Sequence, residues 1–214
     1  MKYNPIYFYS EPDGCYVAMF PELPGCMADG ETIQEALSNL KVSAGEWLYV
    51  NSELGRDDPK ALSDYYDDRT NPSVNDVAVY ILKSTGQITT YALQKLLYYC
   101  QAWSYGWMKE PLFLGDFEAW KGGPVSPTVF RETKGRYLVS EDDIEQSKHI
   151  FSDIERRIIE LVLAVYNDFD GTELSDISHM DTPWIKKREG LSVDQVGHNT
   201  ISPEDMMEYY GNRV

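Results

Sequence analysis

An almost uninterrupted apolar pattern lies near the middle of the chain, between Tyr91 and Trp103. A helix with so little polar surface usually lies inside a domain. Thr89 or Thr90 can cap its first turn, because a hydroxyl at that position accepts a free backbone amide hydrogen. The pattern therefore predicts a central buried helix whose apolar residues are Leu93, Leu96, Leu97, Tyr98, Cys100, Ala102 and Trp103.

The first fifty residues alternate between strand-prone runs and turns. Residues 3–8 and 15–20 are rich in β-prone side chains, and the turn sequence at residues 11–14 joins them, which is typical of an antiparallel hairpin. Residues 26–28 predict a short third strand. Thr32 is then placed to cap a helix that continues to about Val50, with Glu35 completing a capping box. The segment predicts a small β-β-β-α domain.

Residues 51–72 form an acidic stretch with several glycine and proline breakers, and they predict a linker between two domains. The segment from residue 73 onward has mostly helical periodicity. Hydroxyl caps precede several of its apolar stripes, which predicts helices starting near Ser73, Ser126, Ser152 and Ser202. A turn at Asp170 and Gly171 precedes a further short helix that ends at His179. A short extended run at residues 117–121 ends at Gly122, Gly123 and Pro124.

The formal net charge of -16 and a pI near 4.5 restrict the partners that the protein is expected to bind. Phosphate backbones repel so acidic a protein, so autonomous nucleic-acid binding is not expected, whereas association with a basic protein would be accelerated. No apolar run reaches the length needed to cross a bilayer, and the N-terminus lacks the apolar core of a secretion signal. The three cysteines have no metal-site or disulfide spacing, so we expect a cytoplasmic protein.

The N-terminal segment resembles the HicB antitoxin domain, and the matching residues are Asp13–Val17, Phe20–Cys26 and Gly30–Ala36. The resemblance implies a partial ribonuclease-H-like fold that binds a ribonuclease toxin. Nuclease chemistry in such a fold requires several carboxylates that gather metal ions. Glu11 and Asp13 lie in the predicted turn and the strands carry almost no acid, so the sequence indicates a binding domain.

The second segment resembles the SocA-like Panacea domain of antitoxins from about Val74 to Gly211. The matching residues are Leu93–Tyr99, Ala102–Trp103, Phe117–Val125, Leu174–Ser175, His179, Pro183–Trp184, Ile201 and Glu208–Tyr210. The resemblance implies a neutralising module that opposes a protein toxin. The toxin is expected to be basic, or an enzyme that acts on RNA or nucleotides.

The candidate partner-binding residues are those that flank predicted loops, where aromatic side chains can anchor a partner. They are Trp107, Trp120, Lys121, Gly122, Gly123 and Pro124. Gln94 and Lys95 interrupt the central helix and are expected to make structural hydrogen bonds if buried.

No catalytic residue, metal site or cofactor is predicted. His149, His179 and His198 lack metal-ligand spacing. Asp176, His179 and Asp181 could approach one ion, but a structural role for His179 is favoured, because a metal site needs three or four converging ligands. Ser175 and Ser178 lie near His179 without a nucleophile-elbow motif, and phosphate-binding loop motifs are absent.

Together these observations predict an α+β protein with a HicB-like domain at residues 1–50, an acidic linker at 51–72 and a helical Panacea domain at 73–214. The predicted function is that of a type II antitoxin that neutralises a co-encoded toxin by direct binding. The alternative is an adaptor that delivers a partner protein to a protease. Self-association of the chain, which is common among HicB relatives, is a further expectation.

Overall fold

The N-terminal hairpin predicted from the sequence is present in the structure, a computed structural model that describes residues 1–65, 70–145 and 149–211. Strands β1 (Ile6–Ser10) and β2 (Cys15–Met19) pair antiparallel, and β2 pairs with β3 (Met27–Gly30) in the sheet order β1-β2-β3. Gly14 closes the turn with φ of 66°, a left-handed conformation that suits glycine. Asp13 accepts a hydrogen bond from the Ser10 hydroxyl, in agreement with the turn role predicted for it.

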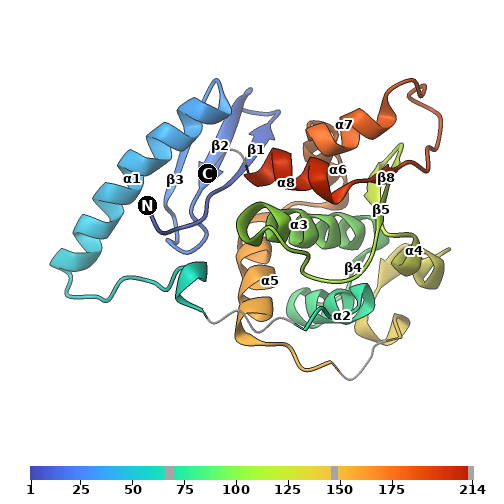
Figure 1. Cartoon of the computed structure of the whole chain (residues 1–214), viewed down its shortest axis with the longest axis horizontal. Coiled ribbons are helices and arrows are strands. Elements are labelled where there is room, and N and C mark those ends of the chain that lie inside the picture. The colour runs from blue at the N-terminus through green and yellow to red at the C-terminus, as the bar shows by residue number, and fades with distance from the viewer. Residues whose placement is uncertain (66–69, 146–148, 212–214) are drawn as a thin grey trace. The chain divides into compact units, whose positions relative to one another are not determined.

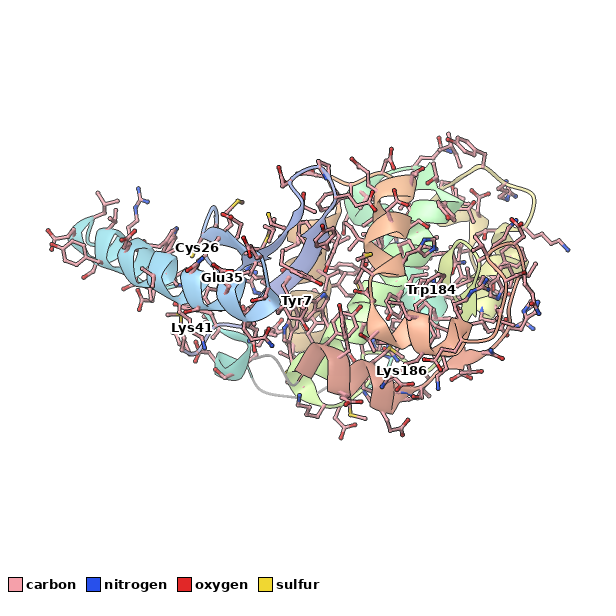
Figure 2. The ribbon with its side chains drawn as sticks, turned by 90° about the horizontal axis from the view of Figure 1, so that it is seen from above. Tyr7, Cys26, Glu35, Lys41, Trp184 and Lys186 are labelled. Atoms are coloured by element: carbon pink, nitrogen blue, oxygen red, sulfur yellow. The ribbon has the colours of Figure 1, made fainter. Side chains whose placement is uncertain are left out.

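Helix α1 (Ile33–Glu53) packs on β2 and β3, as Figure 1 shows, and Figure 2 marks Glu35 and Lys41 on it. Thr32 caps the helix by accepting from the Glu35 amide, but the predicted capping box is wrong in its second half. The Glu35 carboxylate accepts from the amide of Glu31 rather than from that of Thr32. Contacts divide the chain into two units, and residues 54–65, including a 3-10 turn at Leu62–Asp64, belong to the first unit. Residues 66–69 of the predicted linker lie outside the described part of the chain.

The second unit is mainly helical, so the α+β fold class is confirmed. Its helices are α2 (Val74–Thr85), α3 (Thr90–Met108), α4 (Pro127–Thr133), α5 (Asp153–Tyr166), α6 (Gly171–His179), α7 (Thr182–Arg188) and α8 (Pro203–Gly211). Short strands pair as β4 (Ile88–Thr89) with β7 (Leu138–Val139). A second small sheet has the order β6-β5-β8, from Gly123–Val125, Phe117–Trp120 and Thr200–Ile201.

The predicted central helix is confirmed as α3, which contacts α2, α5, α6 and α8 (Figure 1). Its residues from Ala92 to Gly106 are buried. On one side Tyr99 stacks on Tyr166 of α5, with ring centroids 4.1 Å apart and nearly parallel planes. On another side the Tyr210 hydroxyl donates to the Asp181 carboxylate at 2.7 Å, which joins α8 to the start of α7. The unit is therefore built around one aromatic helix.

Capping boxes are present at three α-helix starts of the second unit, and those at Ser73 and Ser152 are predicted from the sequence. Ser73 with Asp76, Ser152 with Glu155, and Asp170 with Glu173 each form a capping box. The predicted hydroxyl cap at Ser126 is wrong: its side chain makes no cap hydrogen bond, and its backbone amide donates to Gln94 instead. Among the helices of the described residues, none combines the length and apolar character that crossing a membrane requires.

Candidate functional site

A largely apolar groove of about 550 Å³ opens beside the turn between β5 and β6. Its walls come from segments distant in sequence: the start of α3, the β5–β6 turn, helix α4 with the loop that follows it, and the loop before β8. A volume of this size falls in the range of small-ligand sites. The apolar and aromatic lining residues are Tyr91, Trp120, Val125, Phe130, Tyr137 and Val196.

The turn that borders the groove packs tightly against helix α3, because two glycines leave room for the side chains of Tyr91 and Lys95. Trp120 pairs with Gly123 in the hairpin, and Lys121 and Gly122 form the turn between them. A Cβ on Gly122 would lie 2.6 Å from the Tyr91 hydroxyl oxygen. A Cβ on Gly123 would lie 2.5 Å from Cε of Lys95, and φ of 99° at Gly123 also disfavours any side chain. The glycine pair is thus required by packing.

The extended run ends before Gly122, as expected, but Gly123 and Pro124 do not continue as a loop, because they belong to strand β6. Pro124 fits there because β6 is an edge strand of its sheet, where a missing amide hydrogen costs no ladder bond. Four of the predicted partner-binding residues, Lys121 with the three that follow it, therefore form a structured hairpin turn.

The Lys95 side chain of helix α3 stabilises this turn from inside the domain. Its side chain is completely buried, its Nζ donates to the Pro124 carbonyl at 3.1 Å, and the ammonium lies 4.5 Å from the centroid of the Tyr91 ring. Burial lowers the pKa of Lys95 to about 7, because the charged amine has lost its hydration. The polar partner that the sequence required for Lys95 is a backbone carbonyl of the turn.

A second support comes from helix α6. The Ser175 hydroxyl donates to the Gly122 carbonyl at 3.0 Å and lies 2.8 Å from the Tyr91 hydroxyl and 3.4 Å from Nε2 of His179. His179 stacks on Trp184 of α7, with ring centroids 4.2 Å apart; Figure 2 marks Trp184. Burial lowers the pKa of His179, and the nearby Lys95 lowers it further. These groups hold the turn, as the structural role favoured for His179 anticipates.

The arrangement of Ser175 and His179 lacks the features of a hydrolytic nucleophile. Ser175 is 3% exposed, and its hydroxyl proton is directed to a backbone carbonyl of the turn. His179 also hydrogen-bonds the backbone of Lys121, whereas a catalytic histidine is usually oriented by a carboxylate. The hydrogen bonds of this pair therefore position the hairpin.

Trp120 forms a fixed wall of the groove. Its Nε1 donates to the Glu118 carboxylate at 2.7 Å, and its ring makes edge contacts with Phe130 and His198. Its carbonyl accepts from Nε1 of Trp184 at 2.9 Å. Contacts at the ring nitrogen, the ring and the backbone fix the position of Trp120, so its side chain presents a preorganised surface.

Trp107 does not belong to this site. It lies near the C-terminal end of α3, where it stacks on Trp103 with ring centroids 5.5 Å apart, whereas the groove adjoins the N-terminal end of the same helix. Sixteen positions separate Trp107 from Tyr91, which corresponds to about 24 Å along a helix. Of the six predicted residues, Trp120, Lys121 and Gly122 line the groove, Gly123 and Pro124 follow them in β6, and Trp107 lies apart.

Gln94 is a site residue whose role the sequence described only in part. Its Oε1 accepts from the Ser126 amide at 2.7 Å, which agrees with the structural hydrogen bond expected. Its Nε2, however, is buried at the groove without a hydrogen-bond partner among the described residues. Phe130, Arg136, Tyr137 and Val196 also line the groove and had no local signal in the sequence.

Residues 1–65, 70–145 and 149–211 contain no cluster of three side chains able to hold a metal ion. His149 contacts Glu155 at 3.1 Å, and His198 contacts Glu118 at 2.7 Å. Asp181, the third residue considered with His179, accepts from tyrosine hydroxyls instead.

Comparison with known proteins identifies a family domain within the second unit. The family model described as "Antitoxin SocA-like, Panacea domain" matches residues 93–185, which include most of the groove. Antitoxin SocA of Caulobacter vibrioides is 36% identical over 110 residues, covering 45% of this chain and 58% of that protein.

Two further relatives are UPF0150 proteins. Protein ssl0259 of Synechocystis sp. is 43% identical over 44 residues, covering 21% of this chain and 60% of its own length. Protein Ta0767 of Thermoplasma acidophilum is 36% identical over 67 residues, covering 29% of this chain and 96% of its own length. The chain thus spans only 58% and 60% of the first two relatives, and no solved structure matches it.

Proposed function

Because the chain belongs with the UPF0150 proteins and carries a SocA-like Panacea domain at residues 93–185, we propose that it is an antitoxin. It neutralises a co-encoded protein toxin by direct, non-covalent binding, as in a type II toxin–antitoxin system. The observation that best supports this function is the preorganised apolar groove beside the β5–β6 turn, most of which lies within residues 93–185. Grooves of this kind bind a partner with little loss of conformational entropy.

Binding rather than catalysis is proposed because the polar residues near the groove are committed to its structure. Lys95, Ser175 and His179 all hydrogen-bond the backbone of the turn. The net charge of -16 favours rapid encounter with a basic toxin, such as an enzyme that binds RNA or nucleotides. Neutralisation then consists of covering or distorting the active site of the toxin.

The N-terminal unit is proposed to be the HicB-like part of the same antitoxin. Its antiparallel sheet with one packed helix supplies the β-β-β-α arrangement expected of it. Whether the toxin contacts this unit, the groove or both follows from variants placed separately in each.

Co-expression tests the proposal. The product of the neighbouring gene is expected to arrest growth when expressed alone and to be harmless when this chain is present, with both proteins recovered in one complex. Continued toxicity, together with the absence of a complex in a pull-down, would refute the antitoxin function. Measuring the half-life of the toxin separates simple occlusion, which leaves it unchanged, from delivery to a protease, which shortens it.

A further inference from the structure

The floor of the groove contains a hydrogen-bond donor whose direction is set by the fold. Gln94 is 2% exposed, and its Oε1 already accepts from the Ser126 amide. The Nε2 is therefore the amide atom left for a ligand, and it has no partner among the described residues. An unsatisfied buried donor is costly, so an acceptor that enters the groove gains more than a surface hydrogen bond would give.

The walls of the groove define the apolar part of the ligand. Trp120 and Phe130 meet edge to face, with ring centroids 4.7 Å apart, and Tyr91 faces the same space. Trp120 and Phe130 do not form a parallel pair that would favour insertion of a flat base. An aromatic or branched aliphatic side chain fits such walls, as at the anchoring positions of protein interfaces.

The rim of the groove carries positive charge in a strongly acidic chain. Lys121 and Arg136 both line the groove and are both exposed, and Arg136 also contacts Asp143 at 3.0 Å. Among the described residues that line the groove, these two are the only ones with charged side chains, and both are basic. A carboxylate on the ligand therefore finds complementary charge here, which sets orientation more than affinity.

From these three features we infer that the groove binds a short extended peptide segment of the toxin. An aromatic or branched side chain of the segment packs against Trp120 and Phe130, and a backbone carbonyl accepts from Nε2 of Gln94. A carboxylate, from an acidic side chain or from the C-terminus of the toxin, lies at Arg136 and Lys121. This inference rests on the proposed antitoxin function and identifies the chemistry of its contact.

The segment differs in charge from the toxin as a whole. Long-range attraction between this acidic chain and a basic toxin brings the proteins together, whereas the basic rim selects an acidic patch over the remaining surface of the toxin. Specificity for one segment follows, because a basic segment would face Arg136 and Lys121 unfavourably.

The test uses the full chain and the purified toxin, with dissociation constants measured by calorimetry. Arg136→Glu is expected to weaken binding about tenfold or more, as reversal of a contacting charge does. Lys134→Glu makes the same charge change two residues away, outside the groove, and is the matched control. Gln94→Glu keeps the acceptor for Ser126 but replaces the donor, and it is expected to weaken binding to a similar extent.

A second pair of variants addresses the apolar wall. Tyr137 is 80% exposed at the groove, and Ile150 is 88% exposed outside it, so Tyr137→Asp and Ile150→Asp should both leave the fold intact. Only Tyr137→Asp is expected to weaken the complex. Overlapping toxin peptides should then identify one segment bound by the wild-type chain and not by Arg136→Glu, and C-terminal amidation distinguishes a terminal from a side-chain carboxylate.

The possible outcomes separate the two proposals. A stable complex whose affinity changes less than about twofold in Arg136→Glu, Tyr137→Asp and Gln94→Glu would overturn the groove assignment and leave the antitoxin function standing. Competition by a mononucleotide for the groove, with no peptide bound, would likewise overturn it. Absence of any complex between the wild-type chain and the toxin would refute both proposals.

Discussion

The buried amine of Lys95 makes the stability of the second unit depend on pH in a predictable direction. Its pKa is about 7 in the folded protein, against 10.5 as the ordinary value. Between these values the unfolded chain binds more protons than the folded chain, so stability rises with pH across that window. Below it the cost of burying the charged amine is present in full, and above it the cost disappears.

The size of the effect follows from the two pKa values. A shift of one pKa unit corresponds to about 1.4 kcal/mol, and because the folded amine is half protonated near neutral pH, raising the pH from about 7 to about 9 stabilises the protein by about 2 kcal/mol. Lys95→Met keeps an unbranched side chain of similar length but cannot titrate. The free energy of unfolding of the variant is therefore expected to lack this increase.

Urea unfolding followed by tryptophan fluorescence measures this difference, because four of the five tryptophans lie in the second unit. The gap in unfolding free energy between wild type and Lys95→Met should change in favour of the wild type by about 2 kcal/mol between the two pH values. Lys134→Met, which replaces an exposed amine, should show no such change. A gap that is the same at both pH values would show that Lys95 does not titrate near neutrality.

Further predictions concern the turn and the contact between α8 and α7. Gly123→Ala is expected to destabilise the protein by about 2 kcal/mol or more, because the added Cβ meets the buried lysine, whereas Gly135→Ala, also at positive φ but in open space, should cost only about 1 kcal/mol. Thermal unfolding of the two variants compares them directly, and equal losses would contradict the packing argument. Tyr210→Phe removes a hydrogen bond to the buried Asp181 carboxylate and should cost about 1–3 kcal/mol in urea unfolding. The same change at the exposed Tyr137 should stay within about 0.5 kcal/mol, and a neutral Tyr210→Phe would mean that the carboxylate is satisfied without it.

Much of the fold could be predicted from the sequence because its signals are local. The central helix is recognisable from an apolar pattern on all sides, and the start of α2 from the Ser73 and Asp76 capping box. The sequence pattern predicts no helix at α7, because Pro183 and Trp184 resemble a turn. Proline is nevertheless compatible with the first turn of a helix, and it lies there in α7.

The candidate site could be predicted only where its residues adjoin one another in sequence. Gly122 and its neighbours are recognisable because they adjoin a predicted loop, and the structure shows why glycines are needed there, in the close approach of Tyr91 and Lys95. Phe130 and Val196 reach the groove only through tertiary packing, which leaves no short-range signal. Trp107 was grouped with the site because it also flanks a loop, although the length of α3 separates them.

The backbone carbonyls of the β5–β6 turn are held from within the domain, by Trp184 at Trp120, Ser175 at Gly122 and Lys95 at Pro124. The side chain of Lys121 is exposed at the tip of this turn and contributes to none of these hydrogen bonds. In the proposed contact with the toxin, different atoms therefore provide stability and recognition. An engineer could therefore vary residue 121 through a library of side chains and redirect the groove to a new target, while the hairpin keeps its shape.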